Sequence, residues 1–365
     1  MTGMENGGGV SVRRRASRNA SGAGPDRDTA FFRYFSDDGD WRTLLLLMAI
    51  YAVWAGLVFF GPGLFSALPG SLLAIVLIAP LLTLHSSTQH EFVHGHPFRA
   101  QWLNDALAFA PIGLLIPYCR FKETHLKHHL DCNLCDPFDD PESWYMDIAG
   151  WLRRNGAARA VFNVNNTFAG RLIVGPLIGT LGLLRNDFRR VVVGEHRLAA
   201  RWLLHGALVG MLVTLIAAHG AVPVWAYLAS CYLAMSLLMV RTFAEHQWSE
   251  RPDGRTIIVE RSPLSLLFLN NNLHLVHHKL PTVAWYRLPS IFRARRAEWL
   301  AMNDGYAFPN YFSLFRSYAF KPKEPVVHPV LRRVAEPGRA FRPRLRARTV
   351  FDAGTAPVPA EPPKE

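Results

Sequence analysis

Residues 43–60 read TLLLLMAIYAVWAGLVFF, a run of eighteen residues without a charge. A second apolar run, LPGSLLAIVLIAPLLTL at residues 68–84, follows after a short uncharged link, and residues 202–218 and 221–240 repeat this pairing. The hydrocarbon core of a bilayer is about 30 Å thick and takes about 20 helical residues to cross. The sequence therefore predicts an all-α membrane protein with four transmembrane helices in two hairpins, at about residues 43–60, 68–88, 202–218 and 221–240.

The composition narrows the class of protein further. Of 365 residues, 50 % are hydrophobic and 19 % are charged, whereas about a quarter are charged in an ordinary soluble domain. The net charge of +12 suits nucleic acid, an anionic membrane or an acidic protein as partner. No zinc-finger, RNP or helix-turn-helix pattern accompanies the charge, so nucleic acid is not expected. Four cysteines form no disulfide framework and are typical of a reducing compartment.

The segments around the apolar runs predict the domain organisation. Residues 1–35 are expected to be a disordered basic tail, residues 36–320 the membrane domain, and residues 321–365 a Pro- and Arg-rich tail that is mostly disordered. Residues 102–118 hold two prolines and two polar residues, Asn104 and Asp105, and are predicted to be re-entrant or interfacial. Residues 172–184 are apolar but are predicted to be too short to span and to lie in the interface.

The distribution of Lys and Arg predicts the orientation in the membrane. Neither hairpin link carries one, whereas the segment 89–201 carries thirteen, and the chain before residue 43 and after Arg241 is also basic. By the positive-inside rule, both termini and the central segment are expected in the cytoplasm. The parts outside the spans would then form a helical cap on the cytoplasmic side.

Histidines are the residues most indicative of chemistry. Eight of the fifteen fall in three clusters, His90-Glu-Phe-Val-His94, His125-Leu-Lys-His128-His129 and His274-Leu-Val-His277-His278. Helical residues at i, i+3 and i+4 share a face, and imidazole suits iron, zinc, copper and nickel. All three clusters are expected in the cytoplasmic cap, and a ninth histidine follows the fourth span by one turn. The candidate ligands, enough for two metal ions, are His90, His94, His125, His128, His129, His246, His274, His277 and His278.

The remaining histidines and several neighbouring residues are expected to have other roles. Hydrogen-bonding or interfacial positions are predicted for His85, His96, His196, His205, His219 and His328, of which His96 is the closest to a cluster. The pair Cys132 and Cys135 is a weak indication of redox or metal chemistry. The acidic residues after the second cluster are expected mostly to cap a helix, with hydrogen bonds to ligand imidazoles as the alternative; they are Asp136, Asp139, Asp140 and Glu142. The same alternative is open for Glu91, Glu245 and the asparagines 270–272, whereas Trp285 and Tyr286 are expected in an interfacial belt.

These clusters resemble the histidine boxes of the integral-membrane fatty acid desaturases and hydroxylases. That family shows H-x3-H or H-x4-H, then H-x2-HH or H-x3-HH, then H/Q-x2-HH around two hairpins, with a further histidine near the end of the last hairpin, where His246 fits. The resemblance covers roughly residues 40–300. Three longer motifs are similar to those of a bacterial subgroup: Q-H-E-x-x-H-G-H at Gln89–His96, D-P-x-D-D-P-E-S at Asp136–Ser143, and N-N-L-H-x-x-H-H-x-x-P-x-x-x-W-Y-x-L-P at Asn271–Pro289. Cys135 departs from the pattern, where a Thr or a similar residue is expected.

The resemblance implies a non-haem centre of two iron ions with O₂ as co-substrate. It also implies the bacterial inner membrane as location, and desaturation of a fatty acyl chain linked to a lipid or a carrier. A chemical argument favours iron, because redox-inert zinc cannot activate O₂ for attack on an unactivated C–H bond. No H-P-G-G haem motif is present, so a separate carrier, a ferredoxin or similar protein, is expected to supply electrons to the basic cytoplasmic face.

Two alternatives remain open at this stage. A hydroxylase or ketolase of the same fold would act on a carotenoid, an alkane or a specialised metabolite. A histidine-rich membrane metal transporter or sensor would place ionisable residues inside the spans, but His205 alone lies within the four apolar runs at residues 43–60, 68–84, 202–218 and 221–240. The oligomeric state is not predicted.

Overall fold

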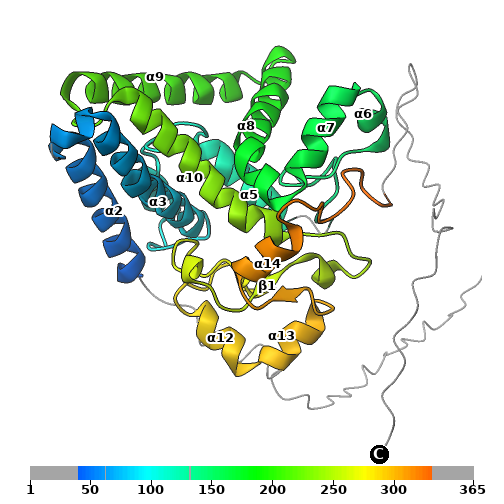
Figure 1. The fold of residues 1–365 in the computed structure, drawn as a ribbon. Coiled ribbons are helices and arrows are strands. Elements are labelled where there is room, and N and C mark those ends of the chain that lie inside the picture. The colour runs from blue at the N-terminus through cyan, green and yellow to red at the C-terminus, as the bar shows by residue number, and fades with distance from the viewer. Residues whose placement is uncertain (1–39, 62, 131–132, 331–365) are drawn as a thin grey trace, which may run out of the picture. The chain divides into compact units, whose positions relative to one another are not determined.

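The structure is a computed structural model that describes residues 40–61, 63–130 and 133–330. The tail predicted at residues 1–35 lies outside the described residues, as do residues 331–365 of the tail predicted at 321–365. The described chain is mostly helical, as predicted, and the strands within it are β1 (Ile258–Val259) and β2 (Ala307–Phe308), which pair in parallel (Figure 1).

Within the described residues, five helices are long and apolar enough to cross a membrane. They are α2 (Trp41–Phe60), α3 (Leu68–Val93), α8 (Phe168–Val192), α9 (His196–His219) and α10 (Val224–Glu245). Three of these, α2, α3 and α9, contain their predicted spans in full, whereas α10 begins at Val224, three residues into the span predicted at 221–240. Each of the four helices extends beyond its predicted span at its polar end.

Helix α8 corrects the expectation that residues 172–184 are too short to span. The helix has 25 residues because it continues through the charged sequence 185–190 at its end. Leu and Arg have high helix propensity, so loss of hydrophobicity alone does not end a helix. Its mean hydropathy of 1.3 is the lowest of the five candidates.

The two predicted hairpins lie side by side, and their tips meet. The short helix η1 (Gly63–Ser66) links α2 to α3, and the backbone N–H of Ala221, in the turn between α9 and α10, donates to the carbonyl of Val58 at 2.8 Å. Along their length α3 packs on α10, where the Thr83 hydroxyl donates to the Ala234 carbonyl at 3.2 Å. Consequently α3 and α10 run in the same direction, away from the shared tip (Figure 1).

Residues 102–118 form a short helix, α4 (Gln101–Ala108), followed by an irregular segment that packs against the hairpins. Irregular backbone at such depth needs partners for its carbonyl groups. Tyr227 of α10 donates its hydroxyl to the Ile112 carbonyl at 2.6 Å, and His205 of α9 lies 2.8 Å from the Leu114 carbonyl.

A helical cap covers the end of the bundle opposite the hairpin tip (Figure 1). Its core joins the ends of α8 and α10 to later segments through buried Phe168, Phe243, Phe268 and Tyr311. Its helices are α5 (Tyr118–Leu130), α6 (Ile148–Leu152), α7 (Gly156–Asn165), α11 (His274–Lys279), α12 (Leu288–Ala294), α13 (Arg296–Met302) and α14 (Tyr311–Tyr318), with the 3₁₀ turns η2 (Pro252–Arg255) and η3 (Pro263–Ser265).

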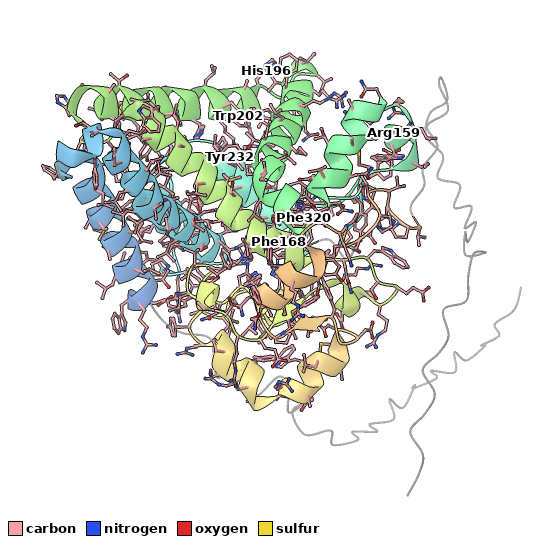
Figure 2. All side chains as sticks on the ribbon, viewed as in Figure 1. Arg159, Phe168, His196, Trp202, Tyr232 and Phe320 are labelled. Atoms are coloured by element: carbon pink, nitrogen blue, oxygen red, sulfur yellow. The ribbon has the colours of Figure 1, made fainter. Side chains whose placement is uncertain are left out.

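The chain remains ordered beyond the predicted boundary at residue 321. After α14 it returns to the start of α8, where the Ala169 N–H donates to the Ala319 carbonyl at 3.0 Å, beside the labelled Phe168 and Phe320 (Figure 2). Met146 then pairs with Val327, and His328 is buried. Composition alone did not reveal these contacts, because a Pro-rich sequence can still be held by partners distant in the chain.

Candidate metal centre

The nine predicted ligands come from four helix ends that converge at the junction of bundle and cap. Helix α3 ends with His90 in its last turn and His94 as its C-terminal cap, and α10 is capped by His246. The i, i+3, i+4 spacing directs the histidines of α5 and α11 to one side of each helix. These two helices supply His125, His128, His129, His274, His277 and His278.

The nine histidines form two groups, in each of which the available nitrogen atoms lie within 4.8 Å of one another. The first group is His90, His94, His125, His129 and His277, and the second is His128, His246, His274 and His278. Each of α5 and α11 therefore divides its histidines between both groups: an i, i+4 pair goes to one and the residue between them to the other. All nine histidines named from the sequence lie in these groups, whereas the division into two groups was not predicted.

Outer hydrogen bonds orient the imidazoles. Nδ1 of His125 donates to Glu142 at 2.9 Å, and Nδ1 of His128 donates to Asp140 at 2.8 Å. In the same way, Nδ1 of His274 lies 2.9 Å from Oδ1 of Asn271. A proton held on Nδ1 leaves a lone pair on Nε2, the atom that binds a metal.

The inward nitrogens lie close to one another. Nε2 of His94 lies 3.1 Å from Nε2 of His125, and Nε2 of His274 lies 3.0 Å from Nε2 of His246. Nε2 of His128 is fully buried and has no hydrogen-bond partner among the described residues. Converging lone pairs need a cation between them, so the donor set fits a metal ion in each group, and its all-nitrogen character suits iron, zinc, copper or nickel.

Burial and nearby charges set the protonation of these histidines. Burial, with the neighbouring His128, lowers the pKa of His246 to about 3, which keeps it in the neutral, metal-binding form. Burial also lowers the pKa of His128, but the carboxylates of Glu142 and Asp140 outweigh it and raise that pKa to about 9. The carboxylates therefore favour a positive charge on the His128 ring, which a proton or a metal ion at Nε2 can supply.

The structure corrects the expected role of the acidic residues. Asp140 and Glu142 accept hydrogen bonds from two of the nine histidines instead of capping a helix. Asp136 keeps a local role, because its carboxylate accepts from the N–H of Phe138 at 2.7 Å in the same turn.

Two other positions named as alternatives also lie at the centre. Asn271 bonds His274, as described above. The Glu91 carboxylate lies 3.4 Å from His90 and accepts from the N–H of Trp285 at 3.1 Å. Trp285 itself donates its indole N–H to Thr43, at the start of α2.

The other histidines lie outside both groups, within the described residues. His85 contacts the Tyr51 hydroxyl at 3.1 Å, and His96 contacts the Thr282 carbonyl at 3.0 Å. The Cys135 thiol donates to the Gln247 carbonyl. Cys132 lies outside the described residues, so a role for the cysteine pair stays a prediction.

A cavity of about 660 Å³ reaches the second histidine group. Glu142, Glu245 and His246 line its polar end. The rest is lined by α3, α5, α8 and α10 and by the irregular segment before α5. Several charged residues of this wall were not predicted from the sequence to belong to a site. Arg171, Lys323 and Glu324 are isolated in sequence, with no spacing that would indicate a site.

The long apolar helices and the paired histidine groups define an integral membrane protein with a site able to hold metal. The chain belongs to the fatty acid desaturase family, because the model of that family matches residues 66–310, which include all nine histidines. No curated protein matches the sequence significantly.

Proposed function

We propose that this protein is an oxygen-dependent desaturase that acts on an acyl chain at a centre of two iron ions. The observation that carries the proposal is the division of nine buried or half-buried histidines into two metal-sized groups in a chain of the fatty acid desaturase family. Iron is the metal of choice in this donor set, because the reaction needs a redox-active ion.

When bound, the iron ions supply the activation of O₂. The balance of the reaction is that a saturated –CH₂–CH₂– unit loses two hydrogen atoms, while O₂ takes up these, two electrons and two protons and leaves as two water molecules. The residues of the chain hold and orient the metal, exclude bulk water by burial, and position the substrate. The electrons come from a separate carrier protein.

The cavity supports an elongated apolar substrate. Its wall includes Leu114, Ile178, Leu183, Met235 and Leu238, and it leads to His246. A pocket of several hundred cubic ångströms is typical of a small-molecule site, and its lining also includes charged residues such as Glu142, Arg171 and Lys323. An acyl chain in this cavity would present its carbons to the second histidine group.

We also propose four membrane crossings, with the cap and both termini in the cytoplasm. The hairpin tips meet at Val58 and Ala221, whereas α8 begins in the cap core at Phe168 and α9 ends at the tip. The start of α8 and the end of α9 therefore lie on opposite sides of the membrane, and the chain between them crosses it an odd number of times. Consequently only one of α8 and α9 spans the membrane. Helix α9 has the higher mean hydropathy, 1.7 against 1.3. We assign the crossing to α9 and an interfacial position to α8.

The positive-inside rule supports the orientation, since the hairpin tips hold no Lys or Arg. The cap surface is basic, with exposed arginines on α12 and α13 such as Arg293 and Arg296. Such a surface suits an acidic electron carrier of the ferredoxin type. The bacterial inner membrane is the proposed location, and its support is the similarity of three sequence motifs to those of a bacterial subgroup.

The test is a lipid and fatty-acid profile by mass spectrometry from cells that express the protein with iron and a ferredoxin system. A product two mass units lighter than its precursor is expected, and His128→Ala should abolish it while the protein still reaches the membrane. His196→Ala is the matched control, because this histidine is exposed at the start of α9 (Figure 2). A product sixteen units heavier would instead indicate a hydroxylase, and retained product in His128→Ala would refute the metal assignment.

A further inference from the structure

Arg171 is a buried cation in the wall of the cavity. It lies in the first turn of α8, it is 3 % exposed, and it lines the cavity that reaches His246. Its Nε donates to the Asn165 carbonyl at 2.9 Å, and its guanidinium carbon lies 3.7 Å from the centre of the Trp144 ring. Within the described residues, its two terminal Nη groups make no hydrogen bond and no ion pair.

The neighbouring charges are engaged elsewhere. The Lys323 ammonium donates to the His246 carbonyl at 2.5 Å and to the Tyr306 hydroxyl at 3.0 Å. Glu324 accepts from the N–H of Trp248 at 3.0 Å and lies 3.4 Å from Lys323, so it acts on Arg171 only at longer range. Arg241 is paired with Glu245 at 2.6 Å. A buried charge without a partner is costly, so an anion from outside the chain is the partner that Arg171 lacks.

Beyond Arg171, the part of the wall that α8 supplies is apolar as far as Leu183 and ends at Asn186. Ile178, Gly179, Gly182 and Leu183 line the cavity, and they follow Arg171 at 7, 8, 11 and 12 residues, which places them on the same face of α8. At 1.5 Å per residue, this face extends about 18 Å from the arginine. An occupant of this cavity therefore carries its charge at one end and an apolar body behind it.

We propose that Arg171 binds the carboxylate of a free acid, whose apolar body lies between α8 and α10. A guanidinium stacked on an aromatic ring is held in one plane and presents two parallel N–H donors, which match a carboxylate. An acyl chain esterified to a lipid or a carrier has no free carboxylate, so it cannot pair with Arg171 in this way. The substrate is therefore a free acid, in place of the lipid- or carrier-linked chain expected from the sequence. That the bound acid is the substrate rests on the proposed function, whereas binding of the anion does not.

The experiment measures binding of dodecanoate, methyl dodecanoate and dodecyl phosphate to the iron-loaded, full-length protein in nanodiscs, with empty nanodiscs subtracted. Dodecanoate is expected to bind more tightly than its methyl ester. Arg171→Gln should weaken dodecanoate binding about tenfold or more, the range for a hydrogen bond to a charged group, and should leave the ester unchanged. Arg171→Lys keeps the charge but loses the two parallel N–H donors, so its affinity for dodecanoate should lie between those of Arg171→Gln and the wild type. Arg189→Gln, an exposed arginine on the same helix, is the matched control.

Equal binding of dodecanoate by the wild type and Arg171→Gln would overturn the proposal, as would equal binding of acid and ester by the wild type. Tighter, Arg171-dependent binding of dodecyl phosphate would replace the carboxylate by a phosphate. Unchanged ester binding shows that the variant's cavity is intact. If the acid binds as expected but is never oxidised, the anion site stands and the proposed function fails.

Discussion

A hydrogen bond at Nδ1 fixes the orientation of an imidazole ring and therefore the direction in which its Nε2 points. Asp140 and Glu142 hold two histidines of α5, and Asn271 holds one of α11, each through Nδ1. Such outer partners fix the tautomer and raise the basicity of the ligand. The centre is therefore prepared by residues that lie outside the histidine clusters themselves.

Asp140→Asn tests this preparation. The carboxylate of Asp140 also accepts from the N–H groups of Cys135 and Glu142, at 2.9 and 2.8 Å. An asparagine would keep the size of the side chain but lose the charge opposite His128, so the affinity for iron should fall about tenfold to a hundredfold. The measurement is the iron content of the purified protein across an iron titration. Glu298→Gln, an exposed change on α13, should bind iron as the wild type does, and the same result for Asp140→Asn would contradict the prediction.

At this scale the sequence was informative about histidines and less so about their partners. A helical spacing of three and four residues places imidazoles on one face whatever the rest of the chain does. The return of Asp140 toward His128 depends on the loop between them, which has no periodicity. The partition into two groups depends on how four helix ends meet, and no local pattern encodes that.

Helix α8 shows why the end of a helix can lie beyond the boundary predicted from the sequence. The charged residues at its end are Arg185, Asp187, Arg189 and Arg190. Asp187 is 1 % exposed and accepts two hydrogen bonds from the buried Arg120 of α5, at 2.6 and 2.8 Å. Trp202 of α9 donates to the same carboxylate at 2.9 Å. Partners 67 and 15 residues away make the charged turn compatible with a packed helix.

Asp187→Asn should therefore destabilise the fold strongly. It leaves the guanidinium of Arg120 buried with reduced compensation, and breaking a buried pair costs about 3–5 kcal/mol. The free energy of unfolding in detergent, followed by denaturant titration, measures this loss. Arg201→Gln removes an exposed partner of Glu123 and should cost about 1 kcal/mol or less. A loss for Asp187→Asn no larger than that of the control would show that the pair contributes little.

At the scale of the whole molecule, apolar runs and histidine clusters constrain each other. Histidines from α3 and α10 can meet only if both helices end on the same side, which is what two hairpins with a common tip provide. The hairpins and the convergence were predictable because both depend on runs within single segments. The cavity was not predictable, since residues from α3 to Glu324 contribute to its wall.

The four-crossing topology makes a prediction about accessibility. With the four native cysteines replaced by alanine, single cysteines at Ser66, Arg197 and Ser290 report the hairpin tip, the junction of α8 and α9, and the cap, because all three positions are exposed. In spheroplasts a membrane-impermeant maleimide should label Ser66→Cys, whereas Arg197→Cys and Ser290→Cys should react only after lysis. The junction decides between the helices: if α8 crosses and α9 does not, Arg197→Cys reacts in intact spheroplasts. Labelling of Ser290→Cys from outside would invert the whole orientation, and with it the side from which electrons reach the metal centre.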